Sequence, residues 1–466
     1  MTEYSPQIRR LLALDLVGFG LLFLVLTYWQ VVMAPRLAAD PHNQRQRLRL
    51  ARVKPGRIYT ADNQLVLDRQ RGEKDWTATY PEGRDFCHLT GYNTQTGLQK
   101  GLGDALFGQG IYANPWRELL RGQPVGNDII LTINAAAQKV ATEEMEGKRG
   151  AVVALDPTTG AILTLVSAPA YDPALVTSTT AEYDLFRLDP QSPELDRTLQ
   201  GLYAPGSVFK LFTAAVAIDL GLATPETKFT CAGRERVSDA TVVCRRPGGH
   251  GSLDLNEALY DSCNVVFAKL AAQIGVESFV SYGKRFHLLD QADVALPSLL
   301  GRMYDFRGFK GKVALAEAGF GQGATMLSPF QVARLTAAIA NRGDVLQPHL
   351  LGTVKTPEGQ VVARGQSRDF GQAVTPATAA TVAGMMEQVV ERGTARGIAM
   401  SRVKVAAKTG SAEVRGKEPH AWFTCFAPAD APRYVVTVVV EHAGSGSEAA
   451  LPIAQRVLAT LLEQQG

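Results

Sequence analysis

The sequence predicts an α+β fold in which two distant hairpins form one antiparallel sheet around a helical middle. The first hairpin is "GAVVALDPTTGAILTLVSAP", residues 150–169, in which a D-P-T-T-G turn separates two apolar runs. The second, near the C-terminus, pairs "HAWFTCFAP" with "RYVVTVVVEH". Between the hairpins, and again after the second, apolar residues recur at helical spacing. We expect helices over residues 207–220, 254–274, 328–341, 376–391 and 448–464.

Two of these helices have clear start signals in the sequence. "SPFQVARLTAAIA" places Ser328 at the N-cap, Pro329 at the first helical position and Gln331 at the third, which is the pattern of a capping box. "TPATAATVAGMMEQVV" begins with a similar Thr-Pro pair at Thr375. Both helix starts are therefore predicted from local chemistry.

An apolar run near the N-terminus predicts a membrane anchor. Residues 16–33 carry no charge, and extending the run back to Leu11 adds only Asp15. At about 1.5 Å per helical residue the run crosses a hydrocarbon core of roughly 30 Å, and no A-x-A cleavage site follows it. We expect residues 1–10 to be a cytoplasmic tail and residues 11–33 a transmembrane signal anchor. A count of the arginines on either side would instead place the bulk of the chain inside the cell, although long domains translocate largely regardless of charge.

The remaining chain divides into a small and a large domain. Residues 34–145 predict a small β-rich pedestal, because "KPGRIYTADNQLVLDRQ" contains two short strand-like runs separated by turn residues. Residues 146–466 hold the predicted sheet and helices. The 48 basic and 45 acidic residues leave a net charge of +3, too balanced for a nucleic-acid-binding protein. We expect no nucleic-acid partner and no cofactor.

Five cysteines are distributed along the chain. Cys231 and Cys244 bracket a short glycine-containing loop in "CAGRERVSDATVVC", a spacing that predicts a disulfide in an oxidising compartment. We expect no metal site, because neither a C-x-x-C pair nor clustered histidines accompany them. Cys263 and Cys425 lie in apolar company, which is typical of buried, unreactive thiols.

The segment "YAPGSVFKLFTAAVA", residues 203–217, places Ser207 and Lys210 at the start of an apolar helix. Residues three apart share a helix face, so the amine of Lys210 can reach the Ser207 hydroxyl. The helix terminus would also favour negative charge that develops beside the serine. Taken alone, however, so short a pattern is better interpreted as a capping serine followed by a solvated lysine.

Two further short segments change this interpretation. "DSCN" supplies Ser262 and Asn264 at a break between helical runs, and "VAAKTGSAE" supplies Lys408, Thr409, Gly410 and Ser411 at the end of a strand-like run. At strand spacing the hydroxyls of Thr409 and Ser411 point to the same side, and Gly410 lets a ligand lie close to the strand.

S-x-x-K, S-x-N and K-T-G in this order resemble the three motifs of penicillin-binding proteins and serine β-lactamases. "GRIYTADNQ", "IILTINAAAQ" and "GFGQGATMLSPFQVA" are similar to segments of the class B enzymes, closest to the short actinobacterial-type proteins with a small pedestal. The resemblance extends from about residue 54 to the C-terminus. Departures are Ser411 where Thr is commoner, Cys263 inside S-x-N and Cys425 where Gly is usual.

The resemblance implies a monofunctional D,D-transpeptidase that cross-links peptidoglycan stem peptides ending in D-Ala-D-Ala and is acylated by β-lactams. Ser207 would be the nucleophile, Lys210 its base and Ser262 a proton relay. The other implied roles are substrate binding by Asn264, Lys408, Thr409, Gly410 and Ser411, and an oxyanion hole formed by the backbone N–H groups of Ser207 and Ser411.

The resemblance also implies a location and a partner. The catalytic domain would lie outside the cytoplasmic membrane. The region between span and sheet is too short for a glycosyltransferase domain, so a SEDS-family polymerase in the membrane is the expected partner. Two alternatives stay open: a D,D-carboxypeptidase or β-lactamase that uses water as the acceptor, and a non-catalytic β-lactam sensor.

Overall fold

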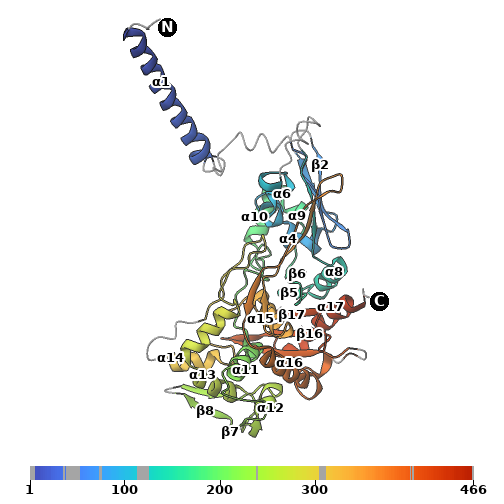
Figure 1. Ribbon diagram of the computed structural model, residues 1–466. Coiled ribbons are helices and arrows are strands. Elements are labelled where there is room, and N and C mark those ends of the chain that lie inside the picture. Colours follow the sequence, from blue (N-terminus) through green and yellow to red (C-terminus); the bar gives the residue numbers. More distant parts are fainter. Residues whose placement is uncertain are drawn as a thin grey trace.

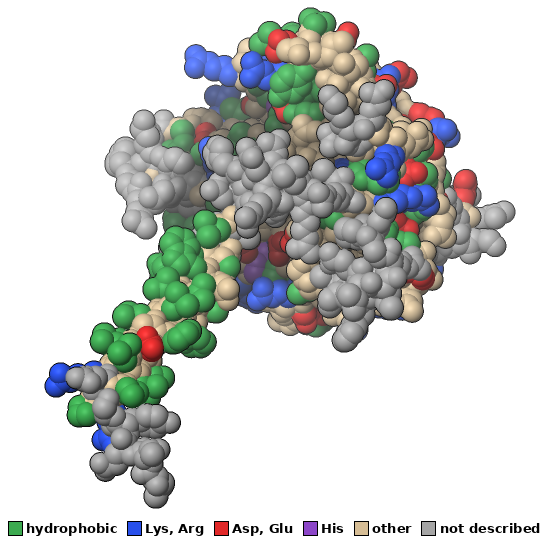
Figure 2. All heavy atoms as spheres, turned by 90° about the horizontal axis from the view of Figure 1, so that it is seen from above, with side chains coloured by type: hydrophobic (Ala, Val, Ile, Leu, Met, Phe, Trp, Pro, Cys, Tyr) green, Lys and Arg blue, Asp and Glu red, His purple; other side chains and the backbone are tan. Residues whose placement is uncertain are grey.

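The N-terminal helix stands apart from the rest of the chain (Figure 1). The structure is a computed structural model that describes residues 6–34, 37, 53–72, 76–112, 125–237, 240–303, 311–398, 400 and 403–463. Helix α1 (Pro6–Thr27) continues into the short π-helix η1 (Tyr28–Met33). The stretch Ile8–Met33 has a mean hydropathy of 2.2 and buries none of its most apolar window, and apolar side chains cover it in Figure 2. It is therefore a candidate membrane span, whereas the arginines between residues 36 and 52 lie outside the described residues.

The central sheet confirms the predicted union of two distant hairpins. Its strand order is β15-β16-β17-β5-β6, with every neighbouring pair antiparallel. The strands are β5 (Gly150–Leu155), β6 (Ile162–Ala168), β15 (Ala406–Val414), β16 (Lys417–Ala427) and β17 (Tyr434–Val440). Every residue of β17 is buried, which means that both faces of the sheet are covered. Figure 1 shows α8 (Ala135–Glu144) and α17 (Leu451–Glu463) on one side and α15 (Pro329–Ala340) on the other.

A second sheet, of six strands, forms the small β-rich part at the top of Figure 1. Its order is β13-β12-β4-β1-β2-β3, and β1 and β4 pair in parallel. The strands are β1 (Ile58–Tyr59), β2 (Leu65–Arg71), β3 (Trp76–Thr79), β4 (Asp128–Leu131), β12 (Leu351–Lys355) and β13 (Val361–Arg364). The last two strands come from far along the chain. They join this sheet because β12 pairs with β4, a contact that sequence order cannot reveal.

The predicted helices are present with two informative changes. The capping box of Ser328 and Gln331 starts α15, and Thr375 caps α16 (Pro376–Glu391), as expected. The expected helix at 207–220 begins as the 3-10 turn η4 (Gly206–Phe209) before α11 (Lys210–Asp219). The expected helix at 254–274 is two helices, α12 (Leu255–Tyr260) and α13 (Asn264–Arg285).

The small hairpins beside α13 complete the helical half of the molecule. Four short strands form two pairs, β7 with β10 and β8 with β9. They are β7 (Lys228–Cys231), β8 (Arg234–Val237), β9 (Ala240–Val243) and β10 (Gly251–Asp254). They lie at the bottom of Figure 1 with α12, and they bring the chain that contains Cys231 and Cys244 against the break between α12 and α13.

Candidate active site

Ser207 lies in the first turn of η4, where the chain packs tightly against the central sheet. Gly206, the residue before it, has φ +56°, and a Cβ there would lie 2.8 Å from the carbonyl oxygen of Ser411 in β15. Only glycine adopts this conformation readily and leaves room for the approach. The sequence Pro-Gly-Ser thus brings the backbones of Ser207 and Ser411 together, the two residues expected to form an oxyanion hole.

Lys210 connects the serine to the S-x-N motif. Its ammonium nitrogen Nζ lies 3.1 Å from Ser207 Oγ and 3.1 Å from Ser262 Oγ. It also donates to the carbonyl oxygen of Ser262 at 2.6 Å and to Asn264 Oδ1 at 2.8 Å. The two short motifs, separated by 52 residues between Lys210 and Ser262, therefore meet at one buried amine.

Ser262 occupies the break between α12 and α13 in a left-handed conformation, with φ +60°. A non-glycine residue rarely adopts this conformation, which costs about 1–2 kcal/mol. The turn aims its hydroxyl between two lysines, because Lys408 Nζ also donates to Ser262 Oγ at 3.1 Å. Lys408 is fully buried and makes a second hydrogen bond to the carbonyl oxygen of Thr409.

Burial lowers the pKa values of both lysines. It lowers the pKa of Lys210 to about 7, with Arg245 adding to the effect and nearby thiols opposing it. The pKa of Lys408 falls well below its ordinary value, first through burial and then through repulsion from Lys210. Burial is therefore the main cause of the lowered pKa at both lysines, and the repulsion between the two amines is expressed at Lys408.

The edge strand β15 supplies the other wall of the site. Thr409, Gly410 and Ser411 line the cleft beside Ser207. A Cβ on Gly410 would lie 3.0 Å from side-chain atoms of both Val208 and Trp422, so a larger residue there would require these neighbours to shift by a few tenths of an ångström. The hydroxyl of Thr409 is hydrogen-bonded to that of Thr394, a residue that the sequence patterns did not single out.

A cleft of about 820 Å³ opens over these residues. All the predicted catalytic and substrate-binding residues except the buried Lys210 and Lys408 line it. Charges of both signs also line it: Arg245 and Arg246 follow β9, whereas Glu413 and Glu418 belong to β15 and β16. A cleft of this size, lined by hydroxyl, amide and charged groups, suits an extended peptide-like ligand.

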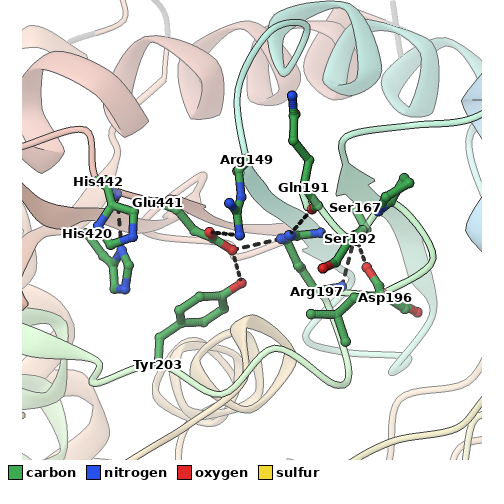
Figure 3. A network of polar contacts seen from close by, with 12 residues as sticks. Arg149, Ser167, Gln191, Ser192, Asp196, Arg197, Tyr203, His420, Glu441 and His442 are labelled. Atoms are coloured by element: carbon green, nitrogen blue, oxygen red, sulfur yellow. Dashed lines mark hydrogen bonds and ion pairs between the residues drawn. The ribbon is translucent and has the colours of Figure 1, made fainter. Parts of the chain in front are cut away.

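A buried ionic network holds the segment that leads to Ser207, as Figure 3 shows. Glu441, just after β17, accepts from Arg197 Nε at 2.7 Å and from the hydroxyl of Tyr203 at 2.8 Å. Arg149 Nη2 contacts its other oxygen at 3.0 Å. Burial alone would raise the pKa of Glu441, but the bonds from Arg197 and Tyr203 hold it below its ordinary value. The network therefore anchors the nucleophile segment to the central sheet.

The cysteine predictions require correction. The structure contains Cys231 and Cys244 as free thiols, not as the disulfide that their spacing predicts. They lie in a cluster with His250 and Cys263 whose ligand atoms are all within 4.8 Å of one another. The argument against a metal site considered only neighbours along the chain, whereas strand pairing gathers four potential ligands that the sequence spreads over 33 residues. The expected absence of a metal stays a prediction. Cys425 is buried as expected, and burial raises the pKa of its thiol to about 12.

A serine beside a buried lysine of low pKa, faced by a strand edge, defines a serine acyl-transfer site. The family model described as penicillin binding protein transpeptidase domain matches residues 150–463, and the chain belongs to this family, among its class B members. The chain is similar to the peptidoglycan D,D-transpeptidase PbpA of Mycolicibacterium smegmatis, at 33% identity over 99% of both chains. It is 30% identical to the MrdA transpeptidase of Acinetobacter baumannii over 82% of this chain and 66% of that one.

Solved structures agree with this assignment. Penicillin-binding protein A of M. tuberculosis, as its ceftriaxone acyl-enzyme, has a TM-score of 0.82 at 28% identity and covers 89% of this chain and 99% of its own. The D,D-transpeptidase domain from Eggerthella lenta has a TM-score of 0.80 at 31% identity, covering 89% of this chain and 100% of its own.

Proposed function

We propose that this chain is a peptidoglycan D,D-transpeptidase that works through an acyl-enzyme on Ser207. The observation that carries the proposal is the position of Lys210 Nζ, within 3.1 Å of both Ser207 Oγ and Ser262 Oγ. A serine is a weak nucleophile unless a neighbouring base takes its proton. A buried lysine with a pKa of about 7 is half neutral near that pH and can act as this base.

In the first half-reaction Ser207 Oγ attacks the carbonyl carbon of the penultimate D-Ala. Lys210 takes the hydroxyl proton, and the negative charge on the carbonyl oxygen is stabilised by the backbone N–H groups of Ser207 and Ser411. The C–N bond then breaks, and Ser262 passes a proton to the departing amine of the last D-Ala. The contact of Ser262 Oγ with both lysines supports this relay.

The remaining site residues hold the substrate. Asn264 would bind the peptide amide, and Thr409 and Ser411 the terminal carboxylate, beside the buried Lys408. Gly410 would contribute its backbone to substrate binding; a Cβ there would face Val208 and Trp422, so glycine lets β15 pack closely against the nucleophile turn. In the second half-reaction an amine from a neighbouring stem attacks the ester. The Ser207 Oγ–carbon bond breaks, the oxygen recovers a proton, and a new amide cross-links the two stems.

A fluorescent penicillin tests the nucleophile. We expect it to label the wild-type chain covalently and to leave Ser207→Ala unlabelled, with Ser447→Ala, a serine elsewhere on the cleft wall, as the matched control. Equal labelling of the wild type and Ser207→Ala would refute the assignment.

The acceptor is tested separately, with a synthetic stem peptide and an amine acceptor. Cross-linked product supports the transpeptidase. Release of D-Ala with water as the only acceptor used, or rapid turnover of penicillin, would favour the hydrolase alternative. Failure of every β-lactam to acylate the chain would favour the sensor.

We also propose the topology and the partner that the sequence suggested. Residues 1–10 would face the cytoplasm, residues 11–33 would span the membrane, and a pedestal over 34–145 would carry the catalytic domain, 146–466, outside. The exposed apolar surface of α1, with no buried residue in its most apolar window, supports the span. Protease treatment of intact spheroplasts should cleave the catalytic domain, and protection would reverse the topology.

A SEDS-family polymerase should co-purify with the full chain. If α1 carries the contact, exchange of α1 for an unrelated span should abolish this co-purification.

A further inference from the structure

Thr394, in the turn after α16, lines the cleft and is hydrogen-bonded through its hydroxyl to the hydroxyl of Thr409 in β15. Within the described part of the chain, Thr394 is the only hydrogen-bond partner of that Thr409 hydroxyl. We propose that Thr394 is a positioning residue for the carboxylate of the substrate. It donates its proton to Thr409 Oγ1 and thereby directs the Thr409 proton to the carboxylate. The inference rests on the proposed function, in which Thr409 binds that group.

The direction of the bond between the two hydroxyls decides what Thr409 can offer to a ligand. A hydroxyl carries a single proton and two acceptor lone pairs. If Thr409 donates to Thr394, it presents only lone pairs to the cleft, and these repel a carboxylate. If Thr394 donates to Thr409, the proton of Thr409 stays available for the ligand. An anionic ligand therefore selects the second direction, and each bond of such a chain polarises the next.

The position of Lys408 makes these hydroxyls more important. The Lys408 side chain is fully buried and does not line the cleft. Its amine donates to Ser262 Oγ at 3.1 Å and to the carbonyl oxygen of Thr409 at 3.0 Å. Within the segment from Lys408 to Ser411, direct contact with a carboxylate in the cleft is therefore left to the hydroxyls of Thr409 and Ser411, which both line it.

The backbones on both sides of the Thr394–Thr409 contact are fixed. Pairing of β15 with β16 holds Thr409 in register. In the turn that contains Thr394, the N–H groups of Gly393 and Ala395 both donate to the carbonyl oxygen of Val389, each at 3.1 Å. The two hydroxyls therefore meet because of the fold, and not through a chance arrangement of flexible side chains.

The turn also packs against the helix that precedes Ser262. A Cβ on Gly393 would lie 2.6 Å from the carbonyl oxygen of Tyr260, the last residue of α12. Helix α16 contacts both α12 and β15. Thr394 is thus held between the strand that carries Thr409 and the helix that leads to Ser262, where it faces the bound substrate.

The preference for a carboxylate tests the role of Thr394. Benzylpenicillin is compared with its uncharged methyl ester as an acylating agent of the full-length chain, and the acyl-enzyme is followed by intact-protein mass spectrometry. Thr394→Val keeps the shape of the side chain but removes the hydroxyl. It should lower the second-order rate constant for benzylpenicillin about tenfold and leave that for the ester unchanged. Thr394→Ser keeps the hydroxyl and should retain the preference of the wild type.

A double variant tests whether Thr394 acts through Thr409. Thr409→Val should lower the preference for the carboxylate at least as much as Thr394→Val, and the double variant should be little worse than Thr409→Val alone. Additive losses would overturn the proposal, because Thr394 would then act independently of Thr409. Thr381→Val removes another threonine hydroxyl of α16, bonded to the carbonyl oxygen of Ala377, and serves as the matched control.

The same rate constants separate this inference from the proposed function. The preference is a ratio within one preparation, so unfolding of a fraction of the chains leaves it unchanged. If Thr394→Val does not fold, Thr394→Ala removes the same hydroxyl with less bulk. An unchanged preference in these variants would overturn the proposal, and so would a wild type that reacts equally with acid and ester. A wild type that no penicillin acylates would instead refute the proposed function, and this inference with it.

Discussion

The two walls of the cleft hold their catalytic groups by different means. On the strand wall, the residues from Ala406 to Ala412 are all in register with β16, so the sheet hydrogen bonds fix Lys408 and Thr409. On the loop wall, Ser262 lies in a turn of positive φ between two helices, and side-chain bonds to Lys210 and Lys408 aim its hydroxyl. Changes to the strand wall should therefore cost mainly stability, and changes to the loop wall mainly activity.

Removal of Lys210 should produce the largest effect, because it takes away both the base and the tie to the loop wall. We expect Lys210→Ala to lower the rate of acylation by a fluorescent penicillin about 10²- to 10⁴-fold. The free energy of unfolding should change little, because the loss of hydrogen bonds is offset by the removal of a costly buried amine. A loss of acylation below tenfold in a folded variant would contradict the role of Lys210 as the base.

The ionic network around Glu441, which anchors the nucleophile segment to the central sheet, should affect stability more than activity. Glu441→Gln removes the charged partner of Arg197, whose side chain is only 1% exposed. Breaking a buried pair from one side costs about 3–5 kcal/mol of stability, measured by denaturant unfolding of the catalytic domain in the full chain. Arg456→Ala, which breaks the exposed pair with Glu144, should cost less than about 1 kcal/mol. Equal losses in the two variants would remove the distinction between anchor and surface pair.

The pH profile should sharpen the assignment of the base. Burial lowers the pKa of Lys210 to about 7. Below that pH the amine is protonated and cannot accept the Ser207 proton, so the second-order rate of acylation should rise about tenfold per pH unit and level off above pH 7. The rates are measured from pH 5.5 to 8.5 with a β-lactam that is stable over this range. A flat profile would show that another group controls the reaction.

The smallest of the four effects concerns the contact between the nucleophile turn and the strand wall. Gly206→Ala forces a side chain into a residue of φ +56° and against Ser411, at a cost of about 1–2 kcal/mol from the backbone conformation. Acylation should slow as Ser207 shifts relative to β15. Gly221→Ala, which also has positive φ but open space around it, isolates the conformational cost from the clash. Identical behaviour of the two variants would show that the contact with Ser411 is unimportant.

The sequence by itself determined the elements whose causes are local. Apolar spacing and cap residues located α15 and α16, with Ser328 and Thr375 at their starts. Apolar runs and turn chemistry located the hairpins of the central sheet, and three short motifs in their order selected the site residues. These signals succeed because each depends on neighbours within a few positions along the chain.

Tertiary structure alone decided which distant residues meet. No local pattern places β12 beside β4, Glu441 beside Arg197, or His250 beside three cysteines, since each contact depends on long-range packing and strand pairing. The same is true of the pKa of Lys210, which falls because the fold removes the amine from water. Residue type and spacing thus identified the chemical groups of this protein, whereas packing determined their distances, burial and proton affinity.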